Sequence, residues 1–167
     1  MTILRPGQIV GIGGFGFDAM VRQAKRPICV NLFGNGRQKM CNIAIDDLTY
    51  YLIGVFDDPR AYGRCYDIGC DDVLTNDRMI DVAADVLGLR HPVKIGLPPA
   101  ILGTFAPIAE RAAKLPRGAL KGLLDSVAAD CVGDVMPLRE ILPRPPLSYR
   151  EAVVRALMSP NDTEVRS

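Results

Sequence analysis

The glycines between residues 11 and 16 form the pattern in this chain with the most recognisable chemistry. Gly11-Ile12-Gly13-Gly14-Phe15-Gly16 satisfies G-x-G-x-x-G, and it lies between a predicted strand that ends at Val10 and a predicted helix that begins at Phe17. In that setting the backbone N–H groups of a helix N-terminus bind phosphate, and glycines let a dinucleotide approach the backbone. One hypothesis is therefore a small, self-contained NAD(P) binder that uses Gly11–Gly16.

The residues around this loop argue against that hypothesis. Pro6 and Gly7 interrupt the preceding strand, which would have to be the central strand of a parallel sheet, and proline removes a backbone donor there. A ribose-binding acid is expected about 20 residues after such a loop. That region instead contains the turn Gly34-Asn35-Gly36, with Arg37 as the basic residue that could bind a phosphate. Arg37 also fits a solvated arginine at a turn.

The other chemically versatile side chains do not form a recognisable site. His91 is the single histidine, there is no G-x-S-x-G sequence, and the five cysteines are never spaced as C-x-x-C. No metal site and no catalytic residue is predicted. We expect the cysteines to be buried, reduced thiols of a cytoplasmic protein.

Composition places the chain among globular proteins and argues against some classes of partner. The 167 residues are 49% hydrophobic and 23% charged, with a formal net charge of +1 at pH 7. Nucleic acid is not an expected partner because no basic block is present. Membrane insertion and export are not expected, because no apolar run approaches about 18 residues and Arg5 and Pro6 interrupt the early one.

Periodicity predicts strands and helices that alternate along the first part of the chain. Strands are predicted at Thr2–Leu4, Gln8–Val10, Ile28–Phe33, Met40–Ile45, Cys65–Ile68 and Val93–Ile95, and helices at Phe17–Lys25, Leu48–Phe56 and Thr75–Leu87. Asp46 and Asp47 are expected to cap the second helix. Thr75 is expected to cap the third helix, and Gly88 to end it.

The later part of the chain is predicted to be mostly helical. Ala100–Lys114 and Arg117–Ala129 read as helices separated by Pro116, and prolines from Pro137 to Pro146 predict an extended segment. Ser148 is expected to cap a last helix, Tyr149–Met158. We therefore expect an α/β region at 1–97, a helical substrate-side region at 98–158, and a flexible tail at 159–167.

Several segments, taken in order, resemble a known family. These are Leu4-Arg5-Pro6-Gly7-Gln8-Ile9-Val10-Gly11, the turn Gly34-Asn35-Gly36-Arg37, Asn42-Ile43-Ala44-Ile45-Asp46-Asp47-Leu48, Tyr66-Asp67-Ile68-Gly69 followed by Val73-Leu74-Thr75, and Ile141-Leu142-Pro143-Arg144-Pro145-Pro146-Leu147-Ser148-Tyr149-Arg150-Glu151-Ala152. Together they resemble the carboxy-terminal part of extended or atypical short-chain dehydrogenase/reductases, which include NAD-dependent epimerases and NmrA-like proteins. The resemblance covers about Thr2–Leu157. It implies a partial Rossmann-like parallel sheet followed by a mostly helical region.

The same resemblance implies that the catalytic and nucleotide-binding groups of the family are missing. In the family, the cofactor glycine motif and a Y-x-x-x-K pair precede the segments matched here. None of the five tyrosines of this chain has a lysine four positions later. That pair transfers the proton and positions the cofactor, so the chain is expected to be inactive alone. NAD(P) is the cofactor implied by resemblance, but the isolated chain is expected to bind none.

Site residues follow from the resemblance as expectations. Gly7, Gln8, Ile9 and Val10 would pass near the nicotinamide and the substrate, and Arg37 would bind a substrate phosphate. Strand and turn packing is the alternative role of Gly7–Val10. An amino-terminal nucleotide-binding half, or another copy of the chain, is the expected partner. A non-catalytic interaction module remains the alternative function, since a parallel sheet cut in this way exposes edges and apolar faces.

Overall fold

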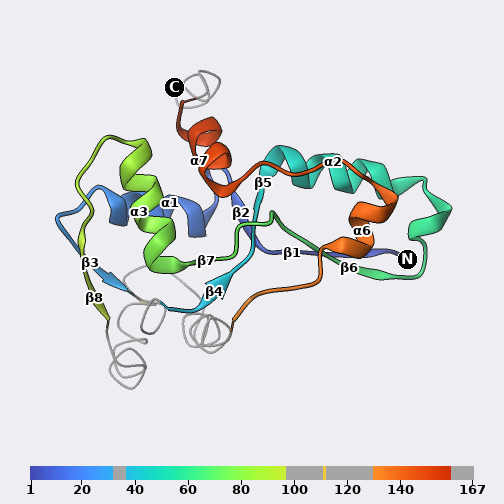
Figure 1. The fold of residues 1–167 in the computed structure, drawn as a ribbon, viewed down its shortest axis with the longest axis horizontal. Coiled ribbons are helices and arrows are strands. Elements are labelled where there is room, and N and C mark those ends of the chain that lie inside the picture. The colour runs from blue at the N-terminus through green and yellow to red at the C-terminus, as the bar shows by residue number, and fades with distance from the viewer. Residues whose placement is uncertain (32–36, 97–110, 112–129, 159–167) are drawn as a thin grey trace.

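The computed structural model describes residues 1–31, 37–96, 111 and 130–158 (Figure 1). The turn at Gly34–Gly36, the tail at 159–167 and, apart from Arg111, the helices predicted between Ala100 and Ala129 lie outside the described residues. None of the helices in the described part combines the length and the apolar character that a bilayer crossing requires.

Parallel pairing dominates the strands. The parallel pairs are β1 (Ile3–Pro6) with β6 (Cys65–Ile68), β2 (Gln8–Val10) with β5 (Asn42–Ala44), and β3 (Ile28–Asn31) with β8 (Val93–Gly96). A short antiparallel pair joins β4 (Lys39–Met40) to β7 (Leu74–Thr75). At least one helix lies between the two strands of each parallel pair in the sequence, as parallel pairing requires, so the predicted α/β class is confirmed.

The helices begin and end for local reasons that the sequence carries. They are α1 (Phe15–Ala24), α2 (Ile45–Phe56), α3 (Asn76–Val86), α6 (Met136–Ile141) and α7 (Tyr149–Met158), with a 3-10 turn, η1, at Pro59–Ala61. The predicted cap of α3 is confirmed, because the Thr75 hydroxyl accepts from the backbone N–H of Arg78. Gly88 has φ +68°, the left-handed conformation that ends a helix.

Two local predictions were wrong. Helix α2 begins at Ile45, three residues before the predicted start, so Asp46 and Asp47 lie in its first turn and neither side chain caps it. Residues Met136–Ile141 form a helix where an extended segment was expected. Pro137 lies at the start of that helix, where its missing N–H has no helical partner to lose.

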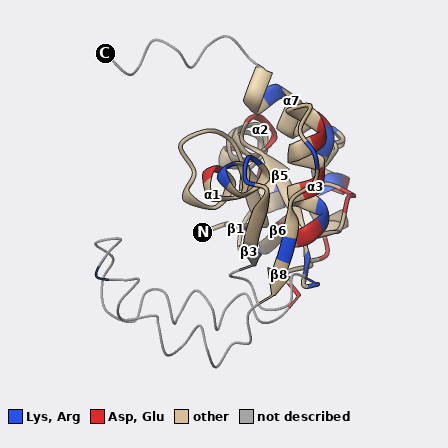
Figure 2. Cartoon of the chain, turned by 90° about the vertical axis from the view of Figure 1, so that its left-hand side faces the viewer, with Lys and Arg blue, Asp and Glu red and all other residues tan. Residues whose placement is uncertain are grey.

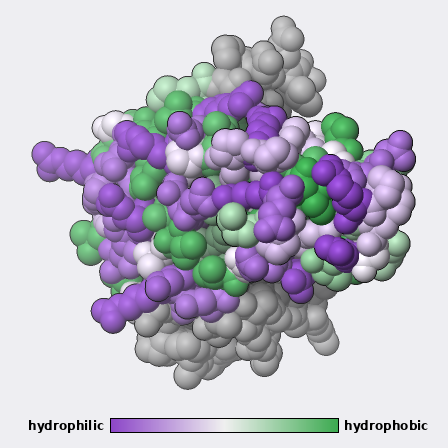
Figure 3. Space-filling view, turned by 45° about the vertical axis from the view of Figure 1, so that its right-hand side comes forward, coloured by the Kyte–Doolittle hydropathy of each residue, from purple (hydrophilic) through white to green (hydrophobic). Residues whose placement is uncertain are grey.

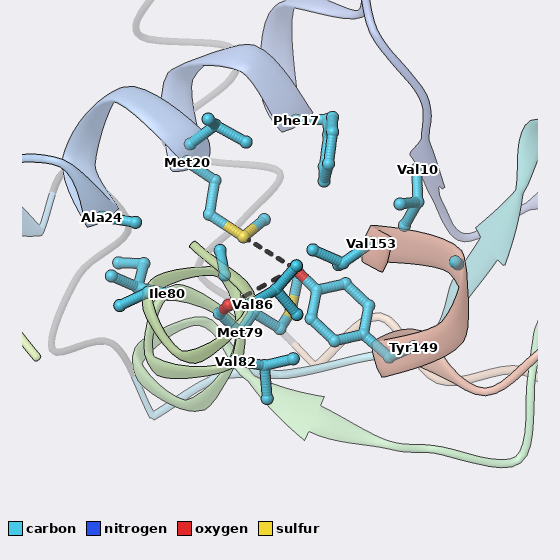
Figure 4. Packing of buried hydrophobic residues seen from close by; sticks show 14 of the residues in the cluster. Val10, Phe17, Met20, Ala24, Met79, Ile80, Val82, Val86, Tyr149 and Val153 are labelled. Carbon is cyan, nitrogen blue, oxygen red and sulfur yellow. Dashed lines mark hydrogen bonds between the residues drawn. The ribbon is translucent and has the colours of Figure 1, made fainter. Parts of the chain in front are cut away.

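The first hydrophobic cluster lies where α1, α3 and α7 meet (Figure 4). Tyr149 is 1% exposed and brings α7 into this cluster. Its hydroxyl lies 2.9 Å from Sδ of Met20 on α1 and 3.4 Å from the carbonyl oxygen of Met79 on α3, and both atoms are acceptors. Burial raises the pKa of Tyr149, so the hydroxyl remains a neutral donor that links the three helices.

A second cluster lies between α2, α6 and the β1–β6 pair. Helix α2 contributes Leu48, Tyr51 and Val55, which face Tyr66 and Ile68 of β6. In Figure 1 this part of the molecule lies opposite the α1–α3 end, and the amino terminus is beside it. The described residues therefore form two apolar cores, and the segments that cross between them hold the fold together.

Ion pairs tie the surface elements of the first core to one another. Acidic and basic residues are interleaved along α3, β8 and α7 (Figure 2). Asp81 of α3 pairs with Lys94 of β8, and Asp85 lies 2.7 Å from His91 and 3.9 Å from Arg150. His91 therefore has a structural role in the described fold.

Residues 142–148, here called the return segment, connect the two cores by running from α6 to α7 across α2. Asp47 is 1% exposed, and its two carboxylate oxygens accept from Arg144 at 3.1 Å and from the backbone N–H of Leu147 at 2.8 Å. The Tyr51 hydroxyl donates to the carbonyl of Arg144 at 2.8 Å, and the Arg144 guanidinium lies 4.8 Å from the centre of the Tyr50 ring. Asp47 is thus the buried anchor of the return segment.

We predict that Asp47→Asn destabilises the protein far more than Asp46→Asn. Asp47→Asn replaces a buried charged acceptor, which costs about 2–3 kcal/mol in the free energy of unfolding. Asp46 pairs with Arg155 at the surface, where an ion pair contributes about 0–1 kcal/mol. Urea denaturation of both variants measures the difference, and equal losses would contradict the anchoring role of Asp47.

The cap of α7 makes stability depend on pH. Ser148 donates to Glu151 from its backbone N–H and its hydroxyl, and the Glu151 N–H donates back to Ser148. These hydrogen bonds hold the pKa of Glu151 below its usual value. A lowered folded-state pKa contributes stability above the unfolded pKa, about 4.3, and this is lost as pH falls through the folded value.

We therefore predict that Ser148→Ala lowers the melting temperature at neutral pH and flattens its dependence on pH below about 5. Thermal melts of the wild type and the variant from about pH 3 to about pH 7, a range that brackets the ordinary carboxyl pKa, measure this difference. Parallel curves for the two proteins across that range would show that the cap does not contribute to acid sensitivity.

Candidate functional site at the ends of β1 and β6

The carboxyl ends of β1 and β6 border a hollow of about 380 Å³. Ligands of open α/β sheets bind at this end of parallel strands, where neighbouring connections diverge. The described lining residues are Arg5, Pro6, Gly7, Cys41, Asp67, Ile68, Asp130, Cys131, Val132, Gly133 and Val135. The hollow is therefore the candidate functional site.

Gly7 shapes this site because the chain changes partner strand there. The N–H of Gly7 donates to the carbonyl of Ile68 at 3.0 Å, and the next N–H, of Gln8, donates to the carbonyl of Cys41 at 2.9 Å. A Cβ atom on Gly7 would overlap the Cys41 carbonyl. Glycine is thus required by close backbone approach at the point where β1, β5 and β6 diverge.

The polar groups of the hollow include one ion pair across the strands. Arg5 and Asp67 are register partners in β1 and β6, and their side chains lie 2.9 Å apart. The Arg5 side chain is 62% exposed, so its guanidinium can still donate to an anion or a carbonyl oxygen. Asp130 accepts from the backbone N–H of Lys39 at 2.8 Å. Asp67 and Asp130 thus bring two carboxylates to the hollow that Arg5 also lines.

The two cysteines of the hollow differ in exposure. Cys41 is buried, and burial raises the pKa of its thiol, which makes it a poor nucleophile at neutral pH. Cys131 is exposed. The expectation of buried thiols is confirmed for Cys29, Cys41 and Cys70 and is wrong for Cys65 and Cys131. Among the described lining residues there is no tyrosine, lysine or histidine.

The residues predicted to lie near the nicotinamide separate into two groups. Gly7 lines the hollow, whereas Gln8, Ile9 and Val10 continue into β2 and are not among the described lining residues. Val10 packs in the first hydrophobic cluster. Gln8 is in register with Asn42 of β5, and both carry a buried amide oxygen without a hydrogen-bond partner among the described residues. Arg37 is exposed and does not appear in the described lining.

The glycine loop at residues 11–14 has the predicted strand–loop–helix setting but a poor environment for phosphate. It joins β2 to α1, and Gly13 has φ +89°. The Asp18 carboxylate accepts from the backbone N–H of Gly13 at 3.3 Å. A carboxylate at this position takes a donor that a phosphate would need and repels its charge. These residues therefore do not fit the pyrophosphate of a dinucleotide.

Sequence reasoning missed most of the residues that line the hollow. The sequence did contain a signal for Asp67. It lies in the predicted strand Cys65–Ile68, and the strand that pairs with this one carries Arg5. The stretch from Asp130 to Val135 had none, since it reaches the hollow from a distant part of the sequence through the bridge between Cys131 and Met40. Short-range patterns do not report such a contact.

No protein-family model matches the chain, and no curated protein matches it. Its fold is similar to that of solved epimerases and reductases. The human epimerase family protein SDR39U1, solved with NADPH, has a TM-score of 0.68 at 16% identity, over 93% of this chain and 48% of that one. UDP-glucose 4-epimerase from Thermotoga maritima, solved with UDP-glucose, gives 0.62 at 16% identity, over 93% and 44%.

A nucleoside-diphosphate-sugar epimerase from Staphylococcus aureus gives a TM-score of 0.67 at 12% identity, over 90% of this chain and 50% of that one. Likeness at these identities establishes the fold, which is the Rossmann-like α/β fold of NAD(P)-dependent epimerases and reductases. The chain spans about half the length of the structures it matches.

We predict that Gly7→Ala destabilises the protein by about 1–3 kcal/mol, because the backbone around Cys41 must move to admit the methyl group. Gly16→Ala is the matched control. Its Cβ would make an ordinary contact, 3.6 Å from the Gln8 amide nitrogen, inside α1, so that variant should gain up to about 1 kcal/mol. Chemical denaturation measures both, and a neutral Gly7→Ala would show that β1 and β5 do not approach closely there.

Proposed function

We propose that this chain is the substrate-side part of an NAD(P)-dependent oxidoreductase or epimerase-like protein, and that it is inactive alone. The observation that carries the proposal is that 93% of the chain superposes on 48% of an NADPH-bound structure. The described residues supply a strand-end hollow but no phosphate cradle and no tyrosine–lysine pair. In the proposal, a nucleotide-binding half supplies those groups, and the cofactor, when bound there, supplies or accepts the hydride.

The hollow at β1 and β6 would then receive the substrate beside the reacting end of the cofactor. Gly7 lets the backbone approach the Cys41 carbonyl closely at this place, and the Arg5 guanidinium offers donors to substrate oxygens. Asp67 holds Arg5 in position through their ion pair. Gln8–Val10 would support the nicotinamide side from β2, and Arg37 would bind a substrate phosphate.

One edge of β1, which no described strand pairs, supports the need for a second half. The N–H groups of Ile3 and Gly7 donate toward β6, so the backbone groups of Leu4, which alternate with them, face the opposite side. Among the described strands, β1 pairs with β6 alone. Parallel sheets are rarely left with an uncovered strand of this kind, and a strand of the nucleotide-binding half would pair with β1 here.

We predict that adding a nucleotide-binding half as a separate chain produces a complex and NADPH turnover, and that neither half alone turns over NADPH. Arg5→Ala should lower kcat/KM of the assembled protein at least tenfold, because donors to the substrate are lost. Arg22→Ala, in α1 away from the hollow, is the matched control and should leave kcat/KM unchanged. The readouts are NADPH absorbance and size-exclusion chromatography, and failure to form a complex with any candidate half would contradict the proposal.

A non-catalytic interaction module is the second candidate. The observations that favour it are the missing tyrosine–lysine pair and the described strands, each of which pairs with a single neighbour. Under this alternative, assembly with a partner would proceed without turnover. The self-contained NAD(P) binder requires Gly11–Gly16 instead, and the geometry at Asp18 weighs against it.

A further inference from the structure

Described residues cover helix α2 on two sides and leave a third side uncovered. The side toward β1 and β6 packs in the second hydrophobic cluster. One flank lies against the return segment, since a Cβ atom on Gly54 would overlap the Leu142 side chain. On the same flank the Arg144 guanidinium lies 4.8 Å from the centre of the Tyr50 ring. Helix α6, which leads into the return segment, contacts β6, so this covered flank is the one toward β6.

The opposite flank carries Ile45, Leu52 and Phe56, here called the α2 flank. Leu52 and Phe56 are each two residues from Gly54, which is about 200° around the helix axis. Phe56 is 85% exposed, Leu52 50% and Ile45 48%. Figure 3 turns this end of the molecule forward, and apolar side chains reach the surface there between charged ones. A row of large apolar side chains at helical spacing normally faces another element, so the α2 flank requires a cover.

The α2 flank follows the strand stretch from β1 to β2 on the side away from β6. At its carboxyl-terminal end it borders a hollow of about 380 Å³, whose described lining also includes Met1 and Thr2, just before β1. At its amino-terminal end, a Cβ atom on Gly11, just after β2, would lie 3.2 Å from the Ile45 side chain. Among the described strands, β1 pairs with β6 alone and β2 with β5 alone. An apolar helix flank and an unpaired strand edge therefore run side by side.

The handedness of parallel sheets indicates which part of a partner would cover this flank. Connections between parallel strands of one sheet are right-handed in about 98% of cases. In the proposed assembly, a strand of the nucleotide-binding half pairs with the outer edge of β1. A helix that follows this strand and leads toward the start of β1 crosses the sheet in the same direction as the connection from β1 to β6. It therefore lies on the same face as α2, beside the α2 flank.

We propose that the α2 flank and the outer edge of β1 form one docking surface for a strand–helix unit of the nucleotide-binding half. The strand pairs with β1, and the helix that follows it packs along the α2 flank. This inference rests on the proposed function and adds to it the part of the partner that docks and its direction. Helix α2 returns from the end of β5 to the start of β6. The docked helix returns in the same sense, so the two helices run parallel.

The position and the chemistry of the docked helix follow from the flank. Its first turn lies beside Ile45 and its last turn beside Phe56. Ile45, Thr49, Leu52 and Phe56 follow one another along this side of α2 and none is charged, so the facing side of the docked helix is apolar at spacings of three and four residues. Phe56 is the main contact, because aromatic side chains supply much of the binding energy of an interface.

Isothermal titration calorimetry tests the docking surface, with the separately expressed half that restores NADPH turnover as the probe. Leu52→Glu combined with Phe56→Glu should raise the dissociation constant at least tenfold, because charges would replace apolar contacts. Met136→Glu, at a 56% exposed position on α6, is the matched control and should bind like the wild type. Thermal melts of the three chains alone should nearly coincide, since these side chains are half or more exposed.

Disulfide crosslinking tests the direction of the docked helix. In a background with Cys65→Ser and Cys131→Ser, Ile45→Cys should crosslink to a cysteine placed in the first turn of the half's helix, and Phe56→Cys to one placed in its last turn. Met136→Cys should crosslink to neither. These substitutions decide the question even if the double glutamate variant fails to fold. The reversed pattern, or equal crosslinking at all three positions, would overturn the proposal.

The outcomes separate this inference from the proposed function. If mixing with a half produces NADPH turnover and the double glutamate variant binds that half as tightly as the wild type does, the docking surface is wrong and the proposed function stands. If no half forms a complex, both are wrong. A wild type that self-associates through this flank, and that the double glutamate substitution converts to a monomer, would show that another copy is the occupant and would also overturn the proposal.

Discussion

The buried carboxylate of Asp47 is the interaction on which the rest of the structure depends. It lies in the first turn of α2 and binds both Arg144 and the backbone of Leu147, so a single side chain fixes the return segment. The return segment then places Tyr149 between α1 and α3. Because α2 also covers β1 and β6, this one buried acid connects the core beside the hollow to the three-helix core.

The candidate site uses backbone geometry more than reactive side chains. Gly7 lets three strands diverge at a narrow place, Arg5 and Asp67 pair across that place, and the stretch from Asp130 to Val135 closes it from a distant part of the sequence. Such a site can orient a substrate, and its described lining contains no tyrosine–lysine pair.

Local sequence signals predicted much of the fold but few of the residues that line the candidate site. Thr75, Gly88 and Ser148 act through neighbours within four residues, so their roles in ending and capping helices could be read directly. Asp47 could not be interpreted correctly, because an acid near a helix start looks like a cap, and its real partners lie about a hundred residues further on. The motif alone was enough to select Gly7. The physical reason for a glycine there is the close approach of the Cys41 carbonyl, which can be seen only once the strands are paired. The lining from Asp130 to Val135 had no local signature at all.

The most direct test of the account is a thermal melt of the isolated chain with and without millimolar NADPH and NADH. The account predicts one cooperative transition whose midpoint is the same in all three samples, because the described residues do not form a phosphate cradle. Binding at 100 times the dissociation constant would add about 2.7 kcal/mol and raise the midpoint by several degrees. A clear rise would contradict the account and would show that the chain binds the cofactor without a second half.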